Sequence, residues 1–395
     1  MSLLNVNLSS FIKISSTWLV ACIPLILIFS SKSSILILFI ISFLLFCYEY
    51  IDNNFKYTNT SYLNNKICLY IFIFVVYGLI SVLWSLDYFQ SLKIILFEFI
   101  LPILLLMSIL CLSYKTISII DLNKCVYGFI IAIIILVYES KSNMAIRSFI
   151  GLRQWHGVLA HAGITLSLIS PIIFVYLYDK SKILSLLFFT SVIFSSIFNI
   201  NDTMKLALII FVFVYISYRY ILNLKIFVFL FLIVYILFQP FIWSYLGSDY
   251  LAKTILGFKQ SAIHRLQIWE TFSNLSLLSP VHGYSISSGH FLYKFDNIIS
   301  QIPNNLHKFV DTWHPHNNFL EIWLDLGIIG IIILILFISE LFKSKWINNR
   351  GHFSTLVSII SVGSCANGFW QGWWITAICF VVLIYRISDS KKCIQ

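Results

Sequence analysis

The sequence predicts an all-α polytopic membrane protein that forms one integral-membrane domain over residues 1–395. Of the 395 residues, 59% are hydrophobic and only 11% are charged, and the mean hydropathy is +0.92. A water-soluble fold could not hide that much apolar surface. The apolar residues also gather in runs of about 20, the length that a helix needs to cross a bilayer.

Twelve apolar runs are candidate transmembrane helices. Eleven helices are also possible, because the fifth run is short and the last two runs nearly abut. The runs cover residues 11–30, 33–51, 67–85, 91–112, 124–139, 159–178, 183–200, 203–221, 225–243, 316–340, 353–370 and 373–388.

The basic residues predict the orientation of these helices. With the N-terminus inside, 15 of the 26 Lys and Arg residues fall on cytoplasmic segments, and the short outer connections hold only Lys32, Lys93 and Lys205. This asymmetry follows the positive-inside rule and places both termini in the cytoplasm. The net charge of +10 comes from cations dispersed between apolar runs, so it predicts no nucleic-acid partner.

Two longer outer segments, 140–158 and 244–315, hold the remaining basic residues. The larger one is too small for an independent core without disulfides, so we expect it to fold onto the bundle through short amphipathic helices. All but one of the histidines lie in these segments or at the membrane edges beside them, which concentrates titratable groups on one face: His156, His161, His264, His282, His290, His307, His314 and His316.

The segment 313–330 joins a polar, histidine-rich loop to an apolar helix. Pro315 disfavours helical geometry at His314, and Asn317 can cap the first amides of the helix that follows. Because a helix N-terminus attracts anions, His316 is a candidate base beside a candidate phosphate site. Asn317 or Glu321 could orient its ring, although His316 could also be a simple helix-start residue.

No metal site or cofactor is expected. The eight cysteines show no CxxC or Cys/His spacing and are interpreted as small buried hydrophobes. The outer segments contain no Asp-x-Asp motif or acidic cluster that would hold a divalent cation.

Four motifs in this order resemble bacterial O-antigen ligases and the related polysaccharide polymerases of the same superfamily. They are Trp84-Ser85 with Asp87, the stretch from Arg153 to Gly157, Arg265 to Trp269 followed by Pro280 to Tyr284, and His316-Asn317 followed after nine residues by Gly327 to Gly330. One position departs from the pattern: at the start of the span near 203, where the family commonly has an arginine, the nearest basic residue is Lys205.

The resemblance implies a glycosyltransferase of the bacterial inner membrane, with its active site facing the periplasm. Such an enzyme moves a glycan from undecaprenyl diphosphate to a hydroxyl of an acceptor sugar. His316 would be the base and Arg265 would stabilise the departing diphosphate; the expected substrate-binding residues are Arg153, Lys205, His314, Asn317 and Glu321. Arginine can stabilise phosphate without a metal, so we expect metal-independent transfer with inversion.

Structural roles compete with these assignments. Arg265 could be a snorkelling interfacial cation, Lys205 could pair with Asp202, and Gly327 and Gly330 could let helices pack closely. Because Pro315 separates it from the helix, His314 fits a structural or substrate-contacting role better than that of a second base.

Two acceptors fit the same chemistry. An O-antigen ligase uses lipid A-core and a polymerase uses another lipid-linked repeat unit, and the motifs favour the ligase slightly. A lipid-linked sugar flippase is the alternative from another class, but it predicts charged residues around a midplane cavity. The spans are nearly free of charge beyond Glu49, Glu98 and Asp325. Nothing in the pattern predicts an oligomeric state.

Overall fold

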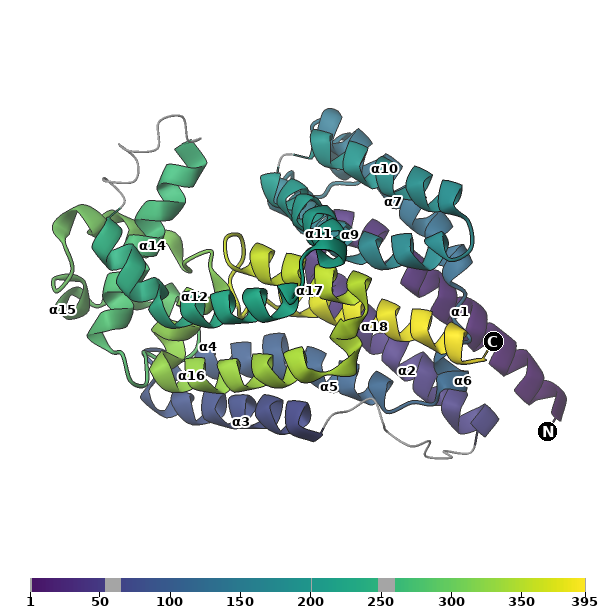
Figure 1. Ribbon diagram of the computed structural model, residues 1–395, viewed down its shortest axis with the longest axis horizontal. Helices are drawn as coiled ribbons and strands as arrows, with labels where there is room; N and C mark the ends of the chain where they lie inside the picture. Colours follow the sequence, from purple (N-terminus) through teal and green to yellow (C-terminus); the bar gives the residue numbers. More distant parts are fainter. Residues whose placement is uncertain (1, 54–64, 200, 248–259, 395) are drawn as a thin grey trace.

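The structure is a computed structural model that describes residues 2–53, 65–199, 201–247 and 260–394 (Figure 1). Part of the predicted outer segment 244–315, residues 248–259, lies outside the described residues. The described residues form helices and no strands. The helices are α1 (Ser2–Phe29), α2 (Ser34–Asn53), α3 (Asn65–Ser81), α4 (Tyr88–Lys93), α5 (Leu101–Leu110), α6 (Tyr114–Ile117), α7 (Leu122–Lys141), α8 (Ala145–Phe149), α9 (His156–Tyr178), α10 (Lys182–Phe198), α11 (Asp202–Tyr220), α12 (Leu224–Leu246), α14 (Gln260–Leu278), α15 (Asp296–Ile299), α16 (Asn318–Lys343), α17 (Arg350–Gly363) and α18 (Gly372–Ile394).

The all-α polytopic membrane architecture is confirmed, with fewer long helices than the sequence suggested. Ten helical segments among the described residues are long and apolar enough to cross a membrane: Leu8–Phe29, Ser31–Asp52, Lys66–Trp84, Tyr88–Leu110, Leu122–Lys141, His156–Tyr178, Asp202–Tyr220, Leu224–Leu246, Asn318–Lys343 and Gly372–Lys391.

Two of the twelve predicted spans fall short. The run at 183–200 is α10, which has 17 residues, and the run at 353–370 is α17, which has 14. At 1.5 Å per residue, α17 is only about 21 Å long, less than the roughly 30 Å hydrocarbon core. The prediction of a span at 353–370 is wrong because residues after Gly363 leave the helix and form a loop that packs on α16.

Helices α9 and α18 form the centre of the bundle. In each of them 78% of the most apolar stretch is buried, more than in any other candidate span described. Helix α9 packs against α1, α10, α11, α17 and α18. Both chain ends lie at one end of the molecule, and α14 and α15 of the large outer segment lie at the other end (Figure 1).

The large outer segment packs on the bundle, as expected, through one long helix and several short ones, among them the amphipathic turn Asn304–Thr312. Its main helix, α14, has 19 residues and packs between α12 and α16. Its apolar residues form a cluster with Leu320 and Leu324 of α16, and the members from the segment include Phe272, Leu292 and Val310. The beginning of α16 therefore serves as part of the core of the outer segment.

Helix α16 is broken at Gly327, whose backbone (φ +59°, ψ −159°) is not helical. The break frees backbone groups, which bond to the segment 280–285. The Leu324 and Asp325 carbonyls accept the backbone N–H of Tyr284 and Ser285 at 2.9 and 2.8 Å, and the Ile328 N–H donates to the Pro280 carbonyl at 2.8 Å. Two of the motifs identified in the sequence thus meet at this break.

We expect Gly327→Ala to destabilise the protein strongly. The φ/ψ region of Gly327 is essentially restricted to glycine, at a cost of about 1–3 kcal/mol for other residues. A Cβ there would also lie 2.4 Å from the Val281 carbonyl oxygen. Thermal unfolding in detergent would measure the loss.

Gly151→Ala is the matched control for this substitution. Gly151 also has a positive φ, +74°, but no atom lies within 4 Å of its added Cβ. The Gly151→Ala substitution should lower the free energy of unfolding only by the strain of the left-handed backbone, about 1–2 kcal/mol. Equal losses of stability in the two variants would contradict the docking role of Gly327.

The tryptophan motif after α3 joins the same outer segment to the bundle. The Trp84 ring contacts the His282 ring at a centroid distance of 5.5 Å. Asp87 caps α4 by accepting the Gln90 N–H at 3.1 Å, and the Ser91 hydroxyl donates to the Ile286 carbonyl at 2.7 Å. These contacts explain the motif as an anchor for the outer segment.

Candidate active site

His316 precedes α16 and is held by a backbone carbonyl. Its Nδ1 lies 3.1 Å from the carbonyl oxygen of Ala366, in the loop 364–371 between α17 and α18. A carbonyl can only accept, so Nδ1 carries the proton of the neutral ring. Nε2, for which no partner is recorded among the described residues, then holds the free lone pair that a base needs.

His314 packs edge-on against His316, with ring centroids 4.2 Å apart. Its Nδ1 accepts the backbone N–H of His316 at 3.2 Å, and the side-chain amide of Gln371 lies 3.0 Å from its Nε2. If the His314 ring were protonated, its Nδ1–H would point at the backbone N–H of His316, and two donors would face each other. Burial, and next the neighbouring His316 and His290, lower the pKa of His314 well below its usual value.

The electrostatics keep His316 neutral at pH 7. Burial lowers the pKa of its ring, the hydrogen bond to Ala366 partly opposes this, and the nearby Arg265 and His264 lower the pKa further. Burial also lowers the pKa of His290, whose ring stacks on Trp313. The neutral ring with its proton on Nδ1 is the form in which His316 accepts a proton.

Arg265 belongs to α14 and faces the same site. Its charge lowers the pKa of both His316 and Cys365. The side chain is half-buried, and no hydrogen bond or ion pair is recorded between it and another described residue. A half-buried guanidinium of this kind has its donors available for a bound anion.

Asn317 and Glu321 hold the framework around His316 and do not contact its ring. The Asn317 Oδ1 caps α16 by accepting the N–H groups of Phe319 and Leu320 at 3.1 and 3.2 Å, and its Nδ2 donates to Tyr235 and Gln239 of α12. The predicted cap is confirmed. The expectation that Asn317 or Glu321 orients the ring differs from the structure, which gives that contact to Ala366.

The Glu321 carboxylate accepts the backbone N–H of Phe369 and so ties the loop 364–371 to α16. Gly368, the preceding residue, lies close to both Glu321 and His314, since a Cβ there would be 3.2 Å from each. Glu321 therefore acts on His316 through the loop that carries Ala366.

The other two basic residues predicted to bind substrate, Arg153 and Lys205, lie outside the contacts around His316. Arg153 is exposed, and its carbonyl accepts the side chain of Arg147 at 2.9 Å. Lys205 pairs with Asp202 at 2.8 Å in the first turn of α11, the structural alternative expected from the sequence. None of the described contacts joins either residue to His316 or Arg265.

An aromatic chain connects the Arg153 loop with the histidines. Trp155 contacts the His161 ring, which stacks on Trp373 at a centroid distance of 3.7 Å. The Trp373 Nε1 donates to Gln371, whose amide reaches His314. Arg153 thus begins a segment that borders the site, although its guanidinium projects outward.

Asp325 is the buried centre that the sequence did not reveal. Its carboxylate accepts the N–H groups of Ser287 and Ser288 at 2.8 and 3.1 Å, the Ser288 hydroxyl at 2.5 Å and the Trp370 Nε1 at 2.6 Å. It joins the outer segment, α16 and the loop 364–371. The only signal in the sequence was a carboxylate inside an apolar run.

Comparisons with known proteins find similarity over the middle part of the chain. Residues 188–335 match the model of a family described as O-antigen ligase. A protein of Rickettsia typhi named "putative polysaccharide ligase" is 29% identical over 157 residues, which are 38% of this chain and 38% of the relative. A protein of Rickettsia felis with the same name is 31% identical over 146 residues, 35% of each chain.

The match therefore spans less than two fifths of the length of these relatives. It is the segment 188–335 that carries the recognised features, because it contains Arg265, the segment 280–284, His316 and the break at Gly327. Through this segment, the chain is similar to the O-antigen ligase family.

Proposed function

We propose that the protein is a membrane glycosyltransferase that moves a glycan from undecaprenyl diphosphate to a hydroxyl of an acceptor sugar. The observation that carries the proposal is the His316 ring, fixed by the Ala366 carbonyl with its Nε2 lone pair free, beside the half-buried guanidinium of Arg265. The family match supports an activity of the ligase or polymerase type.

In this reaction His316 Nε2 takes the proton of the acceptor hydroxyl as its oxygen attacks C1 of the donor sugar. The bond between C1 and the diphosphate oxygen breaks, and undecaprenyl diphosphate leaves. Arg265 stabilises the charge that grows on the leaving group through paired N–H donors. Attack opposite the leaving group inverts C1, and the protein groups require no metal for either step.

Lipid A-core is the proposed acceptor, which makes the protein an O-antigen ligase. The names of the relatives from Rickettsia support this choice. The alternative is an O-antigen or exopolysaccharide polymerase. It is supported by the run from Asn318 to Trp323 and by the Trp84 motif, which also resemble polymerases. Loss of all O-chain in a deletion strain would favour a ligase, and survival of one repeat unit on the core would favour a polymerase.

The acidic residues of the spans argue against a flippase. Glu49 accepts the Ser113 hydroxyl at 2.7 Å, Glu98 accepts the Gly372 N–H at 3.0 Å, and Asp325 has four donors. Each carboxylate already serves as a fixed acceptor between elements. A transporter would instead place such groups around a pathway for ions or substrate.

The proposed location is the bacterial inner membrane, with both termini in the cytoplasm and the site facing the periplasm. Two observations support this orientation: the basic residues favour the side of the termini, and the outer segment with α14 lies at the end opposite to both termini (Figure 1). Cysteines placed at the exposed residues Leu152 and Leu222, and labelled from either side of the membrane, would test this orientation.

The activity test uses purified protein in lipid with an undecaprenyl-diphosphate-linked glycan and lipid A-core. Wild-type protein is expected to transfer the glycan at the same rate with and without excess EDTA, because Arg265 supplies the positive charge that a metal would otherwise provide. A protein inactive with lipid A-core but active with a second lipid-linked repeat unit would be a polymerase. Loss of transfer in EDTA, restored by Mg²⁺, would refute metal independence.

A further inference from the structure

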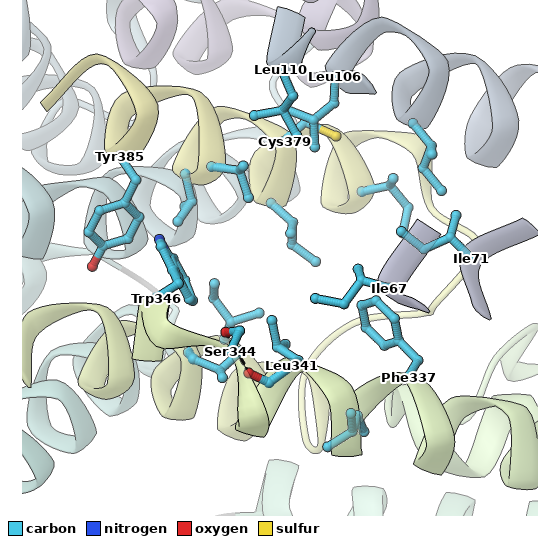
Figure 2. A pocket seen from close by; sticks show the side chains of 18 of the residues that line it. Ile67, Ile71, Leu106, Leu110, Phe337, Leu341, Ser344, Trp346, Cys379 and Tyr385 are labelled. Carbon is cyan, nitrogen blue, oxygen red and sulfur yellow. Dashed lines mark hydrogen bonds between the residues drawn. The ribbon is translucent and has the colours of Figure 1, made fainter. Parts of the chain in front are cut away.

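A chamber of about 1050 Å³ lies between α3, α5, α16, α17 and α18, apart from the site around His316. Figure 2 shows its apolar walls, with Leu106, Leu110 and Cys379 on one side and Phe337 and Leu341 on the other. Small-molecule sites usually measure about 300–1,000 Å³, so this chamber has room for a large ligand. Its walls select for hydrocarbon.

The two ends of the chamber differ in charge. At the end near the beginning of α16 the lining is neutral and includes Asn318. At the other end the lining contains the cations Lys343, Lys345 and Arg386, with Asp389 as the acid. Because the cations outnumber the acid, an amphiphile in the chamber is most stable with an anionic group at this end.

The basic end consists of two exposed lysines and one fixed arginine. Lys343 pairs with Glu340 at 2.8 Å, but its side chain is 66% exposed, where such pairs contribute little. Lys345 is exposed. Arg386 lies over the Tyr114 ring at 4.0 Å and donates to the Leu112 carbonyl, so it supplies a fixed positive charge at the chamber wall.

Aromatic rings close the neutral end. Phe74, Phe99, Phe369 and Trp370 contact one another at centroid distances of 4.8 to 6.1 Å. The Phe369 ring lines the chamber while its backbone N–H turns to Glu321 on the side of the active site. Phe369 and Trp370 belong to the loop 364–371 that holds His316, so these rings stand at the active-site end of the chamber.

We propose that the chamber binds an anionic glycerophospholipid, with its acyl chains between the apolar walls and its phosphate group at Lys343, Lys345 and Arg386. The walls match the hydrocarbon chains, and the cations match the phosphate. The site is independent of the proposed transferase activity.

The test reconstitutes full-length protein in phosphatidylcholine vesicles with or without phosphatidylglycerol and identifies retained lipid by native mass spectrometry. Wild-type protein is expected to retain phosphatidylglycerol in preference to phosphatidylcholine. The double variant Lys343→Gln/Lys345→Gln should bind it at least about tenfold more weakly, given the usual contribution of a cation to binding anionic lipid. Lys32→Gln/Lys93→Gln removes the same charge elsewhere and should bind normally.

A second pair of variants separates the chamber from a basic surface. The Leu341→Trp substitution fills the chamber, so this variant should no longer retain the lipid. Leu336 lies on the same helix, is 42% exposed and does not line the chamber, so the Leu336→Trp variant should still retain it. Equal retention of the two phospholipids, unchanged binding in the lysine variant, or normal retention by Leu341→Trp would overturn the proposal. Retention of polyprenyl phosphate alone would also overturn it.

Discussion

Replacing His316 by alanine is expected to lower glycosyl transfer by about 10²- to 10⁴-fold, the usual contribution of a general base. The side chain supplies the one ring nitrogen placed to accept the hydroxyl proton, since Nδ1 is committed to Ala366. The measurement is kcat/KM for transfer of a lipid-linked glycan to a sugar acceptor by purified protein in lipid.

His307→Ala is the matched control for this prediction, because His307 lies in the same outer segment and bonds locally to the Ile302 carbonyl at 3.0 Å. It should transfer at a rate close to wild type. A His316→Ala protein within about threefold of wild type would remove His316 as the base, because even a modest general base contributes more.

The pH profile gives an independent check on His316. The neutral ring is the active form, and burial with the nearby Arg265 lowers its pKa below the ordinary value. Transfer by wild-type protein should therefore be constant near neutrality and fall on acidification only below about pH 6.5, the unperturbed histidine pKa. A profile that loses half its activity above that value would contradict the environment described for the ring.

Replacing Arg265 by glutamine is expected to cost more than about 100-fold in transfer, because a donor aimed at developing negative charge is usually worth that much or more. Arg265→Lys should retain part of the activity, since it keeps the charge but loses the paired donors. Arg219→Gln, which removes a cation that lies over Tyr220, is the control and should have little effect.

The same Arg265 variant should change the pH profile in a defined direction. Arg265 lowers the pKa of His316, so its removal raises that pKa and moves the acid limb of Arg265→Gln to higher pH. A purely structural arginine would reduce the rate without this shift. A rate loss below about threefold, or an acid limb that stays in place, would demote Arg265 to a folding role.

The sequence points to candidate site residues but not to their long-range contacts. The Asn317 cap was predictable because its partners are the next backbone amides of its own helix. The partner of His316 was not, since a carbonyl 50 residues away carries no mark in the sequence. The loop 364–371 was hidden inside an apolar run that reads as a span.

Trp370 of that loop and Trp373 at the start of α18 show the same limit. In the structure Trp370 is buried and donates to Asp325, and Trp373 stacks on His161. Both rings position the loop that holds His316, and neither role could be read without knowing which elements meet.

The sequence by itself determined a helical membrane bundle, the histidine-rich outer segments and the point where α16 begins. Those features depend on apolar run length, charge and local capping, which are properties of neighbouring residues. Only the tertiary structure decided that α17 is too short to cross a membrane, that α16 breaks at Gly327, and that Ala366 fixes His316. These outcomes depend on backbone groups and buried carboxylates finding partners far along the chain, because a polar group buried without one is costly.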